Sequence, residues 1–127
     1  MSPRRSTTLK VANAPARRSC CPVACSLDVL GDKWTLIIVR DLFRGVSRFS
    51  EFARSPEGIA TNILAARLQM LVQHGLVEQR DDPGSRRKAY VLTPLGETLE
   101  PILVAVADWG TRHIRGTEAK LAPSGTR

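Results

Sequence analysis

The sequence predicts a mainly α-helical domain with one small β-hairpin, an α+β fold. Apolar residues recur at helical spacing in several segments, and two short β-prone runs flank the turn signal Pro83-Gly84. The composition, 43% hydrophobic and 24% charged over 127 residues, is typical of a globular protein. We expect a disordered basic arm at residues 1–19, one domain at 20–115 and a flexible tail at 116–127.

Three helices are predicted in the first half of the domain. Residues 22–30 carry apolar side chains at helical spacing, and Gly31 suits the end of that helix. Asp32 is a favourable N-cap for the second helix, 33–44. This helix is apolar on nearly all sides, so we expect it at the centre of the fold. A short helix over 49–54 comes next.

A longer amphipathic helix is predicted over residues 61–74. Leucines recur on its inner side, Ile59 can pack back onto its first turn, and Gly75 suits its end. Together with the short helix over 49–54, it forms two helices joined by a tight turn. This pair predicts a helix-turn-helix.

A hairpin and a last helix complete the domain. The strands are expected at 76–80 and 89–92, and Pro83-Gly84 fits the central positions of a type II turn. Thr93 caps the last helix, which is predicted to run from residue 94 to about 115. A helix-turn-helix followed by a hairpin makes a winged helix-turn-helix, in which the hairpin is the wing.

The net charge of +7 points to a polyanionic partner, although five of the seven charges lie in residues 1–19. No apolar run approaches the roughly 18 residues of a membrane helix, and the start lacks the apolar core of a signal peptide. We therefore expect a cytoplasmic protein that associates with the nucleoid when bound to DNA and that binds no membrane.

The outer face of the helix over 61–74 is the candidate for reading DNA bases. A helix fits the major groove, where short polar and small side chains can contact base edges. That face holds Thr61, Asn62, Ala65, Ala66 and Gln69. The alternative is that this face is only the solvent-exposed side of an amphipathic helix. A face without Lys or Glu is unusual if its one role is to keep the protein soluble.

Basic residues on both sides of this helix are candidates for contacts with the DNA backbone, which set register but not sequence. Near the helix-turn-helix they are Arg44, Arg48, Arg54 and Arg67. For Arg67 an internal ion pair is an equal alternative. On the wing they are Arg86, Arg87 and Lys88, which suit a minor groove or a phosphate strand. A solvated loop is the alternative for the wing.

Five short motifs follow one another along the chain: Cys-Pro before the first helix, Gly-x-Lys-Trp, Arg-Phe-Ser-Glu, Gly-Leu-Val-Glu and Leu-Thr-Pro-Leu-Gly. Over residues 20–115 the chain resembles the HxlR-type bacterial transcriptional regulators, relatives of MarR-type proteins. The resemblance implies a homodimer that binds a partly palindromic double-stranded DNA operator, with repression as the family tendency. It also implies that the helix from Thr61 is the recognition helix. Many members have a capping Ser where this chain has Ala60, so Thr61 is an alternative cap.

The resemblance also implies that the first and last helices form the dimer surface. Apolar residues from Leu95 to Trp109 alternate in steps of four and three, which is a seam pattern, and so small a domain gains from association. Packing within the same subunit is the alternative. The predicted contacts are Val23, Leu27, Leu99, Ile102, Leu103, Val106 and Trp109.

Three cysteines cluster at Cys20, Cys21 and Cys25, an odd number that argues against a secreted disulfide framework. Cys21 precedes a predicted helix, whose dipole favours a thiolate, and the resemblance implies oxidant or electrophile sensing at the matching cysteine of some members. Cys21 is therefore a candidate redox sensor, and an oxidant or small molecule is the candidate effector. The alternative is a small residue in the dimer contact. Zinc binding with His113 is disfavoured by the spacing, so no metal and no cofactor are expected.

The sequence lacks the residue patterns of an enzyme. We find no nucleophile paired with a base, no phosphate-binding glycine loop and no carboxylate pair in a predicted pocket. The expected function is that of a sequence-specific DNA-binding regulator, with repression expected. The alternatives are a thiol-based sensor acting through Cys21 and a winged helix used only for protein contact.

Overall fold

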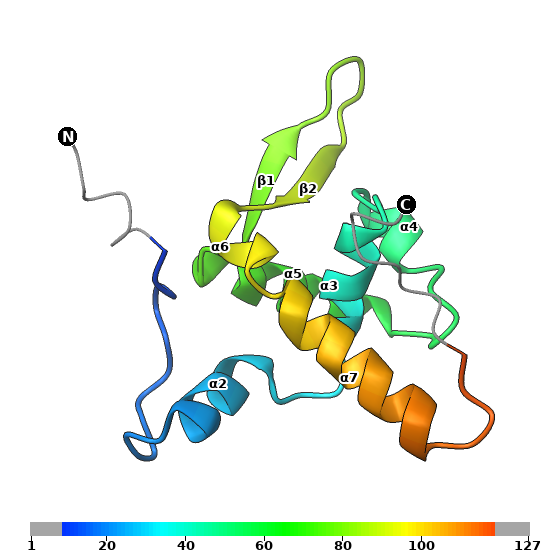
Figure 1. The fold of residues 1–127 in the computed structure, drawn as a ribbon. Coiled ribbons are helices and arrows are strands. Elements are labelled where there is room, and N and C mark those ends of the chain that lie inside the picture. Colours follow the sequence, from blue (N-terminus) through cyan, green and yellow to red (C-terminus); the bar gives the residue numbers. More distant parts are fainter. Residues whose placement is uncertain (1–8, 119–127) are drawn as a thin grey trace.

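The computed structural model describes residues 9–118 and confirms a mainly helical fold with a two-stranded antiparallel hairpin (Figure 1). The helices and strands are α2 (Pro22–Leu30), α3 (Thr35–Phe43), α4 (Phe49–Phe52), α5 (Thr61–Gln73), β1 (Val77–Asp81), β2 (Lys88–Leu92), α6 (Pro94–Glu97) and α7 (Glu100–His113). Helices α4 and α5 are the predicted helix-turn-helix, and the hairpin projects from the helical body as the wing. Over the described range, no helix is long and apolar enough to cross a membrane.

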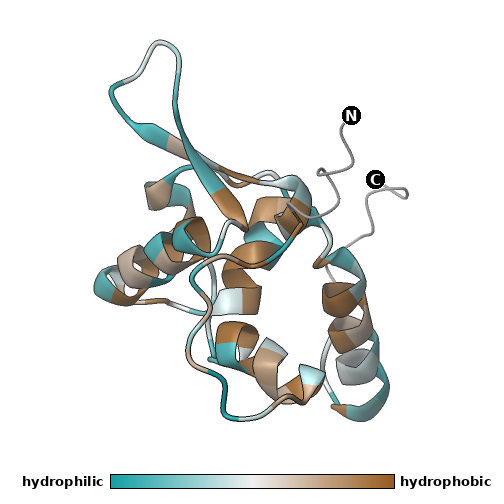
Figure 2. Cartoon of the chain, turned by 90° about the vertical axis from the view of Figure 1, so that its left-hand side faces the viewer, coloured by the Kyte–Doolittle hydropathy of each residue, from teal (hydrophilic) through white to brown (hydrophobic). Residues whose placement is uncertain are grey.

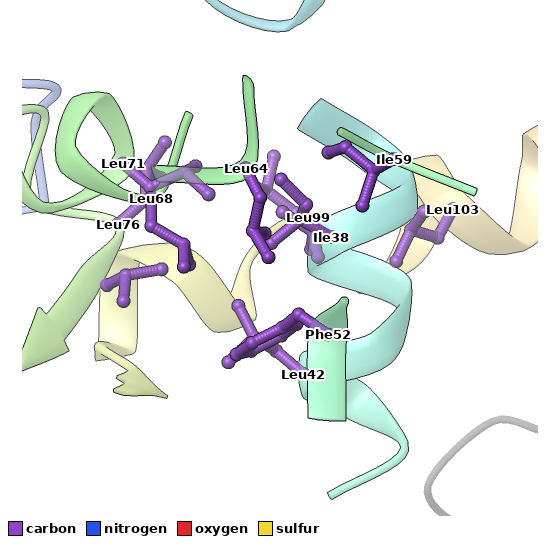
Figure 3. Packing of buried hydrophobic residues seen from close by; sticks show 12 residues of the cluster. Ile38, Leu42, Phe52, Ile59, Leu64, Leu68, Leu71, Leu76, Leu99 and Leu103 are labelled. Carbon is purple, nitrogen blue, oxygen red and sulfur yellow. The ribbon is translucent and has the colours of Figure 1, made fainter. Parts of the chain in front are cut away.

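The hydrophobic core lies around α3 and α5, as predicted for the most apolar helix and the leucine-striped helix. Figure 3 shows the side chains of this cluster packed together between the helices. Its buried members are Ile38, Val39, Leu42, Phe52, Ile59, Leu64, Leu68, Leu71, Leu76, Val77, Leu99 and Leu103. Because the inner side of α5 is fixed in this core, its opposite side must face solvent.

Both ends of α5 are defined by local backbone chemistry. Ala60 stands at the N-cap without a side-chain hydrogen bond and Thr61 is the first helical residue, so Thr61 is not the cap. At the other end Gly75 has a φ of +83°. The Gly75 amide donates to the Val72 carbonyl, and the Leu76 amide donates to the Leu71 carbonyl, both at 3.0 Å. These two bonds form the Schellman motif that a glycine at this position favours.

The wing closes through the predicted type II turn. Gly84 has a φ of +79°, and the Ser85 amide donates to the Asp82 carbonyl at 3.0 Å across the turn. At the base of the hairpin, the Tyr90 amide donates to the Ser47 carbonyl at 2.8 Å. This bond fixes β2 to the connection between α3 and α4. Figure 2 shows the projecting tip of the hairpin in hydrophilic colours.

The predicted last helix is not continuous, because α6 ends at Glu97 and α7 begins at Glu100. The Gly96 amide donates to Thr93 Oγ1 at 3.0 Å, which confirms the predicted cap of α6. Pro101 causes the break, because it has no amide hydrogen for the Glu97 carbonyl and its ring would clash with that carbonyl. The sequence prediction overlooked this proline.

Two of the residues predicted for the dimer surface are buried in the structure, so that part of the prediction is wrong. Leu99 and Leu103 are each only 6% exposed and belong to the core of their own subunit, so they are not available to a second copy (Figure 3). The other predicted contacts remain exposed: Val23, Leu27, Ile102, Val106 and Trp109. The even seam expected from Leu95 to Trp109 is therefore divided into a stripe buried in the core and a stripe exposed at the surface.

Residues 9–19 also depart from prediction, since they contact the domain where a disordered arm was expected. The Ala12 amide donates to the His74 carbonyl at 3.0 Å, and Arg18 Nε lies 2.7 Å from Asp28 Oδ1. Helix ends leave backbone carbonyls without intrahelical donors, and this segment supplies donors at the end of α5. The rest of the expected arm, residues 1–8, lies outside the described residues, as does most of the expected tail.

Candidate nucleic-acid interface

The outer face of α5 brings together the residues predicted to read DNA. All five are exposed and lie within two turns and a half of helix, opposite the buried leucines: Thr61, Asn62, Ala65, Ala66 and Gln69. The amides of Asn62 and Gln69 can each donate and accept hydrogen bonds, which suits paired contacts with adenine, while Thr and Ala can contact a thymine methyl group. The face is therefore polar, small and uncharged.

The four arginines predicted to contact the DNA backbone differ in their partners. Arg48 pairs with Asp82 at the wing, and Arg44 lies 3.9 Å from Asp41 with about one third of its side chain exposed. Arg54 is exposed. Arg67 Nε lies 3.2 Å from Asp32 Oδ1, which favours the internal ion pair over the phosphate contact.

The wing tip retains two unpaired cations. Lys88 pairs with Asp81 across the hairpin, and the ammonium group lowers the pKa of that carboxyl. Arg86 and Arg87 are exposed, and neither has an acidic partner among residues 9–118. These two guanidinium groups are therefore free to meet phosphate, whereas Lys88 would first have to leave Asp81.

Asp32 links the start of α3 to α5. Its carboxylate accepts hydrogen bonds from the amides of Trp34 and Thr35 at 2.8 and 2.9 Å and from the Thr35 hydroxyl, and it also meets Arg67. Burial alone would raise the pKa of Asp32, but these hydrogen bonds and Arg67 together hold the pKa below its usual value. Asp32 therefore binds the free amides at the start of α3, but it is not the predicted N-cap, because the helix starts at Thr35 and Trp34 takes the N-cap position.

A second charged cluster, which the sequence prediction missed, holds the connection between α4 and α5. Arg40 donates to Glu57 Oε2 at 2.7 Å and to Asp41 Oδ1 at 2.9 Å, and Ser55 Oγ donates to Asp41. Glu57, followed by Asp41, raises the pKa of Arg40. Asp41 is 4% exposed, and its position within the apolar stripe of α3 was the signal that it has an internal partner.

Cys20 and Cys21 lie just before α2, and Cys25 lies in its first half. Cys21 is exposed at the N-cap, and its amide donates to Ser19 Oγ at 3.1 Å. Cys25 Sγ donates to the Ser19 carbonyl at 3.3 Å. His113 instead contacts the Trp109 ring at 5.1 Å between centroids. In the described part of the chain, no three His, Cys, Asp or Glu residues are grouped so that they could hold a metal ion.

The chain is similar to known transcriptional regulators. The sequence model of the HxlR-like helix-turn-helix family matches residues 29–118. The HTH-type transcriptional regulator YdeP of Bacillus subtilis (strain 168), itself uncharacterised, is 34% identical over 73% of this chain and 73% of its own. Mycobacterial relatives, 38% identical, are longer, and the match spans 58% of their length.

Solved structures agree with the sequence match. PA1607, assigned as a transcription factor, has a TM-score of 0.77 at 40% identity over 87% of this chain and 80% of its own. The redox regulator HypR in its oxidised form has a TM-score of 0.67 at 35% identity over 73% of this chain and 97% of its own. These similar proteins are regulators, which confirms the prediction that the chain is not an enzyme. The chain belongs to the HxlR-like helix-turn-helix family of DNA-binding transcriptional regulators.

Proposed function

We propose that the chain represses transcription as a homodimer that binds a partly palindromic operator in double-stranded DNA. The observation that carries this proposal is the exposed, uncharged polar face of α5 together with the exposed Arg86 and Arg87 of the projecting wing, which have no acidic partner among residues 9–118. A neutral polar face supports reading of bases, and unpaired cations on the wing support binding of phosphates. A winged helix used only for protein contact would not need this division.

Exposed apolar residues on α2 and α7 support the homodimer. Val23 and Leu27 are 66% and 53% exposed, and Val106 and Trp109 are 54% and 60% exposed. Apolar groups gathered on a surface mark interaction sites, and a two-fold axis lets one patch meet its own copy. Two recognition helices related in this way reach successive major grooves when they lie about 34 Å apart.

Selection of DNA duplexes from a random pool tests the proposal. We expect the protein to enrich two inverted half-sites whose centres are about 10 base pairs apart. Binding to the enriched duplex, measured by fluorescence anisotropy, should weaken as salt increases, with a slope of about −0.9 per phosphate neutralised. A pool that stays unenriched, with equal affinity for scrambled duplexes, would contradict DNA recognition. Enrichment of a single undivided site would contradict the homodimer.

We also propose that Cys21 is a redox sensor, with an oxidant as the effector. Its exposure at a helix N-terminus supports a reactive thiol, and HypR, a similar protein, is a redox regulator. Mild peroxide should modify Cys21, detected by mass spectrometry, and weaken binding to the enriched duplex about tenfold or more. Cys21→Ser should bind the duplex normally, and peroxide should not weaken this binding. Cys20→Ser should lose affinity in peroxide as the wild-type protein does. An unmodified Cys21, or peroxide sensitivity retained in Cys21→Ser, would remove this role.

A further inference from the structure

Residues 9–19, called the strap below, lie against the domain between the end of α5 and α2. Figure 1 shows the strap in blue along one side of the molecule, leading into α2. It precedes the residues that the family model matches, which begin at residue 29. The structure nevertheless gives the strap specific contacts at both of its ends.

At its first end, the strap completes the hydrogen bonds of the recognition helix. The Schellman bonds occupy the carbonyls of Leu71 and Val72, which leaves the carbonyls of Gln73 and of the C-cap His74 without donors from the helix. The Asn13 side-chain amide donates to the Gln73 carbonyl at 2.9 Å, and the Ala12 amide donates to the His74 carbonyl at 3.0 Å. The strap therefore acts as the C-terminal cap of α5.

His74 returns a hydrogen bond to the same strap residue. Its Nδ1 lies 2.9 Å from the Ala12 carbonyl oxygen, which can only accept, so Nδ1 carries the hydrogen. His74 is only 6% exposed, and its Nε2 has no hydrogen-bond partner among the described residues. A buried polar atom without a partner is unfavourable, and an apolar side chain would avoid it. The hydrogen bond to Ala12 therefore accounts for a histidine at this buried position.

At its second end, the strap is fixed to α2. Arg18 Nε lies 2.7 Å from Asp28 Oδ1, and Cys25 Sγ donates to the Ser19 carbonyl at 3.3 Å. Asp28 and Cys25 both belong to α2, the helix that also carries the exposed Val23 and Leu27. The strap thus joins the helix of the proposed dimer surface to the end of the helix that faces DNA.

We propose that the strap positions the recognition helix, and that His74 is a positioning residue for DNA reading although it lies in the core. The reciprocal Ala12–His74 pair holds the last turn of α5 in place, and the contacts with α2 fix the strap itself. The inference rests on the proposed function of α5 in DNA recognition. It requires that loss of the pair loosens α5 and weakens specific binding without changing the oligomeric state.

Ala12→Pro in the full chain tests the pair, because proline removes the amide that donates to His74. Ala16→Pro is the matched control, since the Ala16 amide has no hydrogen-bond partner among residues 9–118. We expect hydrogen exchange in the last turn of α5, followed by mass spectrometry, to be about tenfold faster in Ala12→Pro and unchanged in Ala16→Pro. Affinity for the duplex enriched by the wild-type protein should fall about tenfold, with an unchanged mass by light scattering.

Further variants separate the hydrogen bond and the charge from general packing. His74→Phe keeps a buried ring but loses Nδ1, and should behave like Ala12→Pro. His74→Asn keeps a donor near the position of Nδ1, and should restore part of the affinity. Arg18→Gln should speed exchange in α5. Arg17→Gln removes the same charge and should not, because Arg17 forms no ion pair within the described part of the chain. Equal effects of His74→Phe and His74→Asn would overturn the proposal. Equal effects of Arg18→Gln and Arg17→Gln would also overturn it.

The exchange measurement needs no DNA, so it distinguishes this inference from the proposed function. Wild-type exchange rates in Ala12→Pro would show that the strap does not hold α5, which overturns the inference. Faster exchange with unchanged affinity for the enriched duplex would also overturn it, because the strap would then not position α5 for reading. If the wild-type protein enriches no duplex, the proposed function fails, even where the exchange rates show that the strap holds α5.

Discussion

Val106→Asp is expected to be a monomer at micromolar concentration, where the wild-type protein is expected to be a dimer. Val106 is 54% exposed and lies one turn from Ile102 and nearly one turn from Trp109 on the same side of α7. In a two-fold contact this aspartate would be buried without a partner, which costs several kcal/mol, whereas the isolated subunit can leave it in water. Light scattering after size-exclusion chromatography measures the change directly.

Val104→Asp is the matched control on the same helix. Val104 is also at the surface, with 36% exposure, but it points to a different side of α7 from Val106. Val104→Asp should stay dimeric. Monomers of Val106→Asp can hold only one half-site each, so affinity for the enriched duplex should fall by about a hundredfold or more. A dimeric Val106→Asp, or equal dissociation of both variants, would contradict the assigned surface.

Gly96→Ala is expected to lower the free energy of unfolding by about 3 kcal/mol, because the added methyl group overpacks the contact between α6 and the base of the hairpin. A Cβ atom at this position would lie 2.1 Å from the Leu76 carbonyl oxygen and 2.9 Å from Leu92 Cδ2. The first neighbour is backbone at the start of the wing, which cannot rotate away as a side chain can. Repair of the clash must therefore move α6 away from the hairpin.

Gly110→Ala gives the comparison for this effect. Nothing lies within 4 Å of a Cβ atom at Gly110, which is inside α7, so alanine should stabilise the helix by about 0.5–1 kcal/mol. Urea denaturation of both variants, followed by circular dichroism, measures the two changes. Equal stability of Gly96→Ala and the wild-type protein would show that α6 does not close on the hairpin as the structure describes.

The parts of the fold that were predictable from sequence depend on signals a few residues long. The leucine spacing of α5 determines which side is buried, and therefore which side can face DNA. Gly75, Pro83-Gly84 and Thr93 each serve a backbone conformation or cap that few other residues suit. Because such requirements are local, the recognition helix and the wing turn could be predicted without knowledge of the tertiary structure.

The parts that could not be predicted depend on contacts between distant residues. Arg67 meets Asp32, and Arg48 meets Asp82, although nothing in the spacing of either pair identifies the partner. The pairing of Ala12 with His74 joins residues 62 positions apart. Leu99 was assigned to the wrong stripe because an apolar residue can satisfy its own core or a second copy equally well. The break between α6 and α7 is different, because the chemistry of Pro101 could have predicted it from the sequence.

The central claim, that α5 reads base sequence while the wing binds phosphate, is tested most directly by competition binding on the enriched duplex and its single-base variants. Asn62→Ala should lose about 1–3 kcal/mol of discrimination at one base position and little affinity for random DNA. Arg87→Ala should weaken binding to every sequence alike and reduce the salt slope by about one. Equal and small effects of both variants on specific and random DNA would contradict this division of roles.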